Sequence, residues 1–392
     1  MTESEQPLAN YQYEIYLRGM AGERPDLPLS YEGMRRQAKR TLSLGAYGYV
    51  AGGAGAEATV RANRAAFGRW QIVPRMLRDI AARELSTELF GTTMPAPLAL
   101  APIGVQSIVH RDGELATARA AAATGVPYIH STAASHSLEE AAEAMGDAPR
   151  WYQLYWPKDP ELARSLLRRA EAAGYGAVVV TLDTWLLAWR PRDLQQAYLP
   201  FLHGEGLANY LSDPVFRAGL ERAPEEDMQA AVGRWIATYS DPTVSWEDLS
   251  FLRESTRLPI VLKGILHPDD ARLAVEHGMD GIVVSNHGGR QVDGAVATLD
   301  ALPAVLAAVP DEFPVLLDSG IRSAADAFKA LALGARAVLL GRPYAWALAC
   351  GGEAGVTTLL RSFLAELDLT LALSGHTTWG ELGPDALRRA DD

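Results

Sequence analysis

The feature that most constrains the fold is a regular alternation of short apolar runs with alanine-rich, amphipathic segments. The apolar runs, rich in Val, Ile and Leu, are 97–103, 127–131, 150–155, 177–183, 259–263, 281–285, 314–318 and 337–341. Continuous apolar runs of this length are typical of strands that are buried on both faces of a parallel sheet. Several of the intervening segments begin with capping signals, such as Ser137 followed by Glu140, or Asp300 before an apolar run. Eight strands that alternate with helices predict an α/β fold of the (β/α)8 TIM-barrel type.

Two segments do not fit this repeat. Residues 1–90 precede the first strand and are expected to be mainly helical. Residues 190–250 separate the fourth and fifth strands, where a crossover needs only one helix, so we interpret them as an insertion of about 40 extra residues. An insertion at the carboxyl end of a barrel strand lies over the face where active sites form, which favours a lid over a subunit-packing loop. We therefore expect a single domain over 1–392, made of a helical N-terminal extension (1–90), a barrel (91–189 and 251–373) and a lid insertion (190–250).

Charge and composition exclude several classes of partner. The chain carries 36 Lys and Arg against 48 Asp and Glu, a formal net charge of −12. An acidic surface argues against nucleic acid or an anionic membrane as the main partner, because both attract basic patches. No uncharged apolar stretch is long enough to predict a transmembrane helix, and the first ten residues lack a signal-peptide pattern. Because Cys350 is the only cysteine, no internal disulfide is possible, and a cytoplasmic protein is expected.

Polar side chains recur where the expected strands end. They include Gln153 and Tyr155 after the third run, Thr181 and Asp183 in the fourth, Lys263 in the fifth, and the segments 285–291, 318–322 and 341–343 after the last three. Because the carboxyl ends of barrel strands lie on one face, we expect these groups to line one site. No metal is expected there, because His110, His267 and His277 have no partners at ligand spacing.

The last two strand ends suit a phosphate group. Gly320 and Gly341 allow the backbone to approach an anion closely, and Arg322 and Arg342 supply charge and forked donors. Barrel enzymes often bind phosphate in the loops after strands seven and eight. An ordinary turn with surface arginines is the alternative.

Three motifs carry a resemblance to a known family. SNHGGRQ at 285–291, LKG at 262–264 and the long motif at 318–343 are similar to those of the FMN-dependent α-hydroxy acid oxidising enzymes, and the match runs from about 31 to 373. Within that family, GYVAGGAG at 48–55 and LDTWLLAWRPRDL at 182–194 most resemble lactate 2-monooxygenases. The resemblance implies that the phosphate-bearing ligand is FMN. It also implies a homotetramer or homo-octamer.

The resemblance implies roles for the substrate site. His287 matches the catalytic base of the family, Asp183 its carboxylate partner, and Tyr155 a tyrosine that contacts the substrate hydroxyl. A neutral imidazole can accept the proton of a 2-hydroxy acid, and a neighbouring carboxylate is expected to raise its pKa.

Other matches concern the substrate carboxylate. Arg290 and Arg190 match two arginines beside it, with Arg192 as a competitor for the second. Tyr49 matches a tyrosine that hydrogen-bonds the carboxylate, with Tyr47 as its competitor.

The resemblance also implies the flavin contacts. Backbone atoms of the first strand end and a set of polar side chains match residues that contact the ring, the ribityl chain or the phosphate: Pro102, Ile103, Gly104, Ser131, Gln153, Thr181, Lys263, Ser285, Asp318, Gly320, Arg322, Gly341 and Arg342. Lys263 would stabilise the reduced, anionic ring.

The expected activity is oxidation of a short L-2-hydroxy acid, with L-lactate first, dioxygen as the electron acceptor and no nucleic acid or membrane partner. Lactate 2-monooxygenase, which yields acetate, CO2 and water, is favoured because of the long segment 190–250. The alternatives are an oxidase that releases pyruvate and hydrogen peroxide, an FMN-dependent isomerase and a non-catalytic flavin-binding protein. Ala133 stands where glycolate oxidases carry a bulky aromatic side chain, so substrates larger than glycolate are expected to fit.

Overall fold

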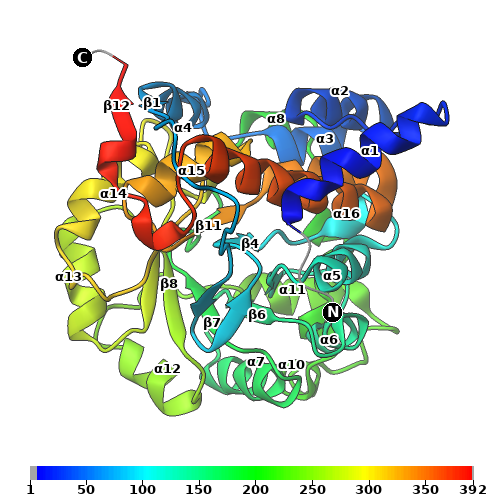
Figure 1. Cartoon of the computed structure of the whole chain (residues 1–392). Coiled ribbons are helices and arrows are strands. Elements are labelled where there is room, and N and C mark those ends of the chain that lie inside the picture. The colour runs from blue at the N-terminus through cyan, green and yellow to red at the C-terminus, as the bar shows by residue number, and fades with distance from the viewer. Residues whose placement is uncertain (1–6, 391–392) are drawn as a thin grey trace.

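Eight parallel strands close into a barrel in the computed structural model, which describes residues 7–390 (Figure 1). In chain order the barrel strands are β4 (Leu98–Leu100), β5 (Tyr128–Ser131), β6 (Arg150–Leu154), β7 (Val178–Thr181), β8 (Ile260–Ile265), β9 (Gly281–Val284), β10 (Val315–Leu317) and β11 (Ala337–Leu340). Each pairs with its neighbours in sequence, and β11 pairs with β4 to close the ring. The eight apolar runs of the sequence are therefore the eight strands, and the predicted (β/α)8 barrel is confirmed.

Both faces of these strands are buried. Val179, Val261 and Val283 belong to a cluster inside the barrel, whereas Val178 and Leu262, one position away on the same strands, pack in the larger outer core. All of these residues have at most 1% of their surface exposed. Since successive side chains of a strand point to opposite faces, burial on both sides requires the unbroken apolar runs seen in the sequence.

Helices surround the barrel, and the outer ring includes α5 (Gly113–Thr124), α6 (Leu138–Met145), α7 (Pro160–Ala172), α12 (Leu249–Ser255), α13 (Pro268–Glu276), α14 (Thr298–Leu306), α15 (Ala324–Ala332) and α16 (Arg342–Leu373). Ser137 and Glu140 form the expected capping box at α6. Asp300 is not a cap: α14 begins two residues earlier, and Asp300 pairs with Arg69 instead. No helix within residues 7–390 is long and apolar enough to cross a membrane.

A hairpin that the sequence did not reveal plugs one end of the barrel. It consists of β2 (Thr87–Leu89) and β3 (Thr92–Met94), and Leu89 and Met94 pack inside the barrel. The indole Nε1 of Trp151, at the start of β6, donates to Thr92 Oγ1 at 3.0 Å. The hairpin therefore closes the amino end of the barrel and leaves the carboxyl end for a site.

The N-terminal extension contains η1 (Leu8–Asn10), α1 (Tyr11–Met20), α2 (Tyr31–Thr41), α3 (Leu44–Ala51), α4 (Ala58–Gly68) and β1 (Trp70–Ile72). The chain end adds η5 (Trp379–Glu381), η6 (Pro384–Ala386) and β12 (Leu387–Arg389). Strand β12 pairs antiparallel with β1. Helices α1 and α2 pack against α16, so the extension is part of the same compact body (Figure 1).

The insertion is more helical than its sequence pattern indicates. It contains α8 (Pro191–Gln195), η3 (Pro200–His203), α9 (Ala208–Leu211), α10 (Pro214–Ala218) and α11 (Met228–Thr238). Proline occupies the first turn of α8 and α10, where its missing N–H costs nothing. All of these elements except α11 have five residues or fewer, which is why little sustained helical periodicity is visible in the sequence.

Candidate active site

A cavity opens at the carboxyl ends of the barrel strands. Most of the candidate site residues line it, namely Tyr49, Pro102, Ile103, Gly104, Ser131, Tyr155, Arg190, Lys263, His287, Arg290, Asp318, Gly320, Arg322, Gly341 and Arg342. The other four adjoin residues of this lining: Gln153 is hydrogen-bonded to Ser131, Asp183 to His287 and Ser285 to Lys263, and Thr181 is the strand partner of Lys263. Strand register explains the convergence, because Thr181 is paired with Lys263 and Ser131 with Gln153 on neighbouring strands.

The central pair of the site is His287 and Asp183. His287 Nδ1 lies 2.7 Å from Asp183 Oδ1 and 3.1 Å from Thr184 Oγ1, whose hydroxyl donates to the same carboxylate oxygen at 2.9 Å. With Nδ1–H donated to Asp183, the Nε2 atom of His287 is the one available as a base.

The ionisation of this pair follows from burial and neighbouring charge. Burial opposes the ionised form of Asp183, but the positive charges of His287 and Lys263 outweigh it and lower the pKa of Asp183 to about 2. For His287, burial lowers the pKa more than Asp183 raises it, so its pKa lies below 6.5. Asp183 raises the pKa of His287 as expected, but desolvation of the imidazolium, which the sequence did not reveal, outweighs this effect. His287 is thus neutral near pH 7 and able to accept a proton.

The backbone presents His287 in an unusual way. Its φ is +54°, and Gly288 and Gly289 continue in the left-handed region at +66° and +76°. Non-glycine residues rarely adopt this conformation, and such strain concentrates at functional sites. Hydrogen bonds hold it in place, because Ser285 Oγ accepts from the N–H of His287 at 3.1 Å and Asn286 Oδ1 from that of Gly289 at 3.1 Å.

Two arginines converge on the same cavity. The guanidinium of Arg290 lies over the ring of Tyr49 at 4.9 Å and donates to the carbonyl oxygen of Tyr49. Arg190 donates from Nε to the carbonyl oxygen of Arg290 at 3.0 Å and is 6% exposed. Burial and the charge of Arg190 lower the pKa of Arg290 to about 10. Two buried, mutually repelling cations form a site for an anion.

The structure distinguishes the candidates Arg190 and Tyr49 from their competitors in the sequence, Arg192 and Tyr47. Arg192 points away from the cavity and forms a bidentate pair with Glu57, at 2.7 Å for both contacts. Tyr47 is 9% exposed and stacks on Trp346 with ring centroids 5.4 Å apart. Arg190 and Tyr49, in contrast, line the cavity.

A buried ion pair lies on the other side of the cavity. Lys263 Nζ is 3.1 Å from Asp318 Oδ2 and donates to Ser285 Oγ at 2.9 Å. Burial disfavours the charged lysine, but Asp318 and Asp183 outweigh it and raise the pKa of Lys263. Lys263 is therefore a fixed positive charge between two carboxylates.

Two polar atoms beside this ion pair are buried without a partner. Gln153 Oε1 accepts from Ser131 Oγ at 2.9 Å, but the Nε2 atom of Gln153 and the Oγ1 atom of Thr181 have no hydrogen bond within the described part of the chain. Buried polar groups are nearly always paired, so these atoms indicate a ligand that presents a donor and an acceptor to them.

The third region of the cavity is positively charged. Burial, Arg322 and Arg290 lower the pKa of Arg342 to about 9. Arg342 donates to the carbonyl oxygens of Val50, Gly288 and Gly52 at 2.8–2.9 Å, and Arg322 lies 4.7 Å from the ring of Tyr31. A Cβ on Gly341 would lie 3.9 Å from its nearest neighbour, the Cβ of Ala101, so no atom crowds the backbone there. A cluster of cations beside an accessible glycine backbone suits a phosphate.

Several cavity residues were missed in the sequence. Leu187, Phe201 and Tyr239 come from the loop after β7 and from the insertion, and Ser319 lies between two recognised candidates. The rings of Tyr239 and Tyr155 are 5.4 Å apart. Only Ser319 had a detectable signal, its place in the strand-end motif, because the other three are ordinary apolar or aromatic residues that the fold brings to the site.

Comparison with known proteins identifies the ligand. The family model for FMN-dependent dehydrogenases matches residues 38–389. The chain belongs to this family. FMN is accordingly its cofactor, and the residues fit it: the unpaired Gln153 Nε2 and Thr181 Oγ1 suit the edge of a flavin ring, and the cationic region suits its phosphate.

Relatives of this FMN-dependent dehydrogenase cover nearly its whole length. The chain is 46% identical to the FMN-dependent alpha-hydroxy acid dehydrogenase qulF of Penicillium citrinum, over 97% of this chain and 96% of that protein. It is 43% identical to an L-lactate oxidase of Lysinibacillus sphaericus, over 93% and 94%. The crystal structure of a mandelate oxidase superposes with a TM-score of 0.81 at 40% identity, covering 92% of this chain and 98% of that one. The protein is thus an FMN-dependent α-hydroxy acid oxidoreductase.

Proposed function

We propose that this enzyme oxidises short L-2-hydroxy acids, L-lactate foremost, and passes the electrons to dioxygen. The observation that carries the proposal is that one cavity holds His287, paired with the carboxylate of Asp183, together with the buried arginines Arg190 and Arg290. A 2-hydroxy acid presents a hydroxyl to be deprotonated beside a carboxylate to be bound.

The side chains divide the work in a way that their chemistry dictates. Arg290 and Arg190 bind the substrate carboxylate, for which guanidinium geometry is suited, and Tyr49 borders the same region. His287 Nε2 accepts the proton of the hydroxyl, and Asp183 stabilises the imidazolium that forms. Bound FMN supplies the acceptor for the two electrons of the substrate's C–H bond. Lys263 places a positive charge where negative charge accumulates.

Cavity walls support a substrate with a small or moderate apolar side chain. Ala133 lines the cavity and is 3% exposed, and Leu187, Phe201 and Tyr239 add apolar surface. The space next to Ala133 supports the proposed preference for lactate, whose side chain is a methyl group. The names of the relatives, which include lactate and mandelate oxidases, support the same substrate class.

A second candidate outcome is lactate 2-monooxygenase. In that reaction pyruvate stays in the site while peroxide decarboxylates it to acetate and CO2. The contribution of Phe201 and Tyr239 from the insertion to the cavity wall favours retention of product. The L-lactate oxidase among the relatives covers 93% of this chain, so the length of the insertion does not by itself separate the two outcomes.

One experiment tests the proposal. Anaerobic mixing with L-lactate should bleach the yellow flavin, and His287→Gln should keep the bound flavin but slow its bleaching by about 10²–10⁴-fold. Undiminished bleaching by the variant would refute His287 as the base. Turnover in air with catalase then separates the outcomes, because pyruvate indicates the oxidase and acetate with CO2 indicates the monooxygenase. Absence of bleaching by any short 2-hydroxy acid would refute the proposed function.

A further inference from the structure

The loop between β5 and α6 forms part of the cavity wall. Ser131 at the end of β5 and Ala133 in the loop both line the cavity. The carbonyl oxygen of Ala133 accepts from the N–H of Val105 at 2.9 Å, and a Cβ on Gly104 would approach that oxygen to 2.2 Å. The loop is therefore in contact with the 102–104 segment, which also lines the cavity. A shift of this loop would move two sections of the wall together.

One residue of the insertion, Asn209, holds this loop by hydrogen bonds from the side opposite the cavity. Asn209, in α9, is 0% exposed. Its Nδ2 donates to the carbonyl oxygens of Ser131 and Thr132 at 3.1 and 3.0 Å, and its Oδ1 accepts from the N–H of Leu138 at 2.7 Å. One amide side chain thus holds the beginning and the end of the loop together.

The residues before Asn209 contact the same loop in succession. The N–H of Ala208 donates to the carbonyl oxygen of Ala134 at 3.0 Å. Gly206 has φ +77°, and a Cβ there would lie 3.2 Å from the carbonyl oxygen of Ala133. Glu205 Oε2 accepts from Ser107 Oγ at 2.5 Å, and Ser107 in turn accepts from Ser135 Oγ at 2.7 Å. Residues 205–209, which we call the clamp segment, therefore lie against the loop at Ala133 and Ala134 and reach Ser135 through Ser107.

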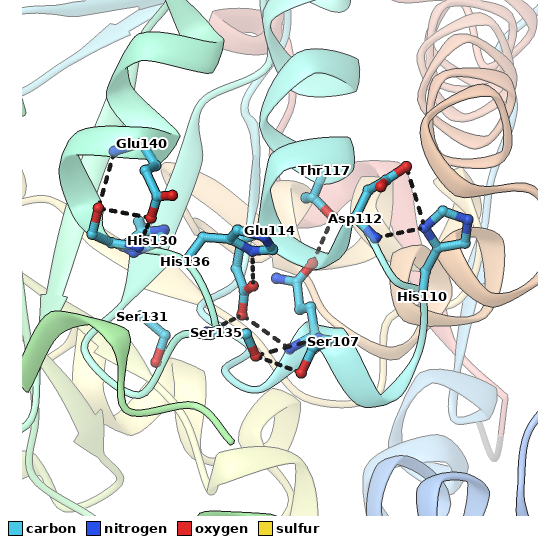
Figure 2. Close-up of polar contacts among 12 residues, drawn as sticks. Ser107, His110, Asp112, Glu114, Thr117, His130, Ser131, Ser135, His136 and Glu140 are labelled. Carbon is cyan, nitrogen blue, oxygen red and sulfur yellow. Dashed lines mark hydrogen bonds and ion pairs between the residues drawn. The ribbon is translucent and has the colours of Figure 1, made fainter. Parts of the chain in front are cut away.

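Hydrogen bonds also hold the side of the loop that faces the barrel helices. Figure 2 shows the carboxylate of Glu114, from α5, beside Ser135 and His136. Glu114 is 0% exposed, accepts from the N–H of Ser135 at 3.1 Å and lies 3.1 Å from His136 Nδ1. The loop is therefore held from two sides, by Glu114 of α5 and by Asn209 of the insertion.

We propose that the clamp segment sets the size of the substrate pocket, with Asn209 as the positioning residue for the loop that carries Ala133. Asn209 does not line the cavity; it acts through Ser131, Thr132 and Leu138. Residues 205–209 of the insertion are then a fixed determinant of substrate specificity. Only the other residues of the insertion are free to behave as a lid. The proposal rests on the proposed oxidation of 2-hydroxy acids.

The test is a comparison of two substrates that differ in size. Asn209→Asp keeps the shape of the side chain but replaces the donor to two carbonyl oxygens with an acceptor. We expect the variant to bind FMN and to shift the ratio of kcat/KM for L-3-phenyllactate over L-lactate at least fivefold toward the larger acid. The change should come mainly from KM, and the visible circular dichroism of the bound flavin should change.

A matched control separates positioning from general loss of stability. Arg234→Gln breaks contacts of the same insertion with the carbonyl oxygen of Gly219 and with Asp159 at the start of α7, at 3.3 and 3.5 Å, and neither contact involves Asn209 or the loop. It should lower the melting temperature and leave the substrate ratio unchanged. An unchanged ratio in Asn209→Asp, or an equal shift in Arg234→Gln, would overturn the proposal.

A second variant decides the question if Asn209→Asp does not fold. Glu205 is exposed, so Glu205→Ala should fold and should shift the ratio in the same direction by a smaller factor. An unchanged substrate ratio in Glu205→Ala would also overturn the proposed role of the clamp segment. If the wild-type enzyme oxidises neither acid, the proposed function fails; if it oxidises both and the ratio does not move, only the clamp fails.

Discussion

The proton-accepting power of His287 reflects two opposing effects on one side chain. Burial favours the neutral imidazole and the contact with Asp183 favours the charged form, and burial wins. A base that is neutral at physiological pH, yet has a carboxylate ready to stabilise its charged form, suits a reaction that creates the imidazolium only transiently. Asp183 stays ionised throughout because its pKa is about 2.

The pH dependence of flavin reduction tests this balance. In the wild-type enzyme kcat/KM should fall as the pH drops below 6.5, because His287 becomes protonated and cannot accept a proton. Asp183→Asn removes the carboxylate that raises the pKa of His287, so this acid limb should move to lower pH, and kcat should fall by roughly 10²-fold. Stopped-flow bleaching between pH 4.5 and 8 measures both quantities. An acid limb that stays in place would contradict the assignment.

Strand β5 shows how one element serves both the core and the site. Ser131 faces the cavity, whereas His130, one position earlier, points outward and is 0% exposed. The His130 ring packs edge-on to Tyr128 at 5.9 Å and lies 3.4 Å from the Nδ2 of Asn209. Burial lowers the pKa of His130 to about 4. The outer face of β5 is thus a surface on which the insertion rests.

His130 should make stability depend on pH. Its folded-state pKa of about 4 is lower than the unfolded value of 6.5, so its contribution is present above pH 6.5 and is lost as the pH falls toward 4. The loss should reach about 3 kcal/mol, or roughly 4 °C in melting temperature for a chain of this size. Calorimetry of wild type and His130→Gln checks this, since the variant should lose less on acidification. Parallel curves for the two proteins would show that His130 does not contribute.

Contacts between distant parts of the chain hold the N-terminal extension onto the barrel. The carboxylate of Asp368, in α16, is 0% exposed and accepts from the N–H of Ala9 at 2.8 Å. It also forms a two-point contact with Arg83. One buried charge therefore joins three segments that lie far apart in sequence and holds both ends of the N-terminal extension against α16.

Removal of this charge should weaken the whole fold. Asp368→Asn leaves Arg83 without its counter-charge, and breaking one partner of a buried pair costs about 3 kcal/mol. The melting temperature should fall by roughly 4 °C, whereas the acid limb of kcat/KM should not move. As a control, Arg119→Gln breaks an ion pair with Glu353 whose side chains are 40% and 46% exposed, and it should cost less than about 1 kcal/mol. Equal effects of the two variants would contradict this argument.

Much of the architecture follows from local pattern. The eight barrel strands were recognisable because strands buried on both faces need continuous apolar runs, and a parallel barrel needs a helix between most of them. The strand ends were recognisable as a site because the topology puts them on one face, and FMN followed from the family resemblance of the motifs around His287 and Arg342. Strands β1, β2, β3 and β12 were not recognisable, because each is short and contains at least one polar residue, whereas the equally short β4 and β10 lie within continuous apolar runs.

Only the tertiary structure decided the electrostatics and the pocket walls. The pKa of His287 depends on how deeply the fold buries it, which no spacing of residues encodes. Arg190 and Arg192 are equivalent in sequence, and they differ because Glu57 lies next to one of them. Tyr239 reaches Tyr155, and Asn209 reaches Ser131, through contacts between residues far apart along the chain. Burial and contacts between distant residues are properties of the folded chain. The sequence pattern therefore indicated where the cavity lies, at the carboxyl ends of the strands, whereas only the folded structure determined which groups the cavity can bind.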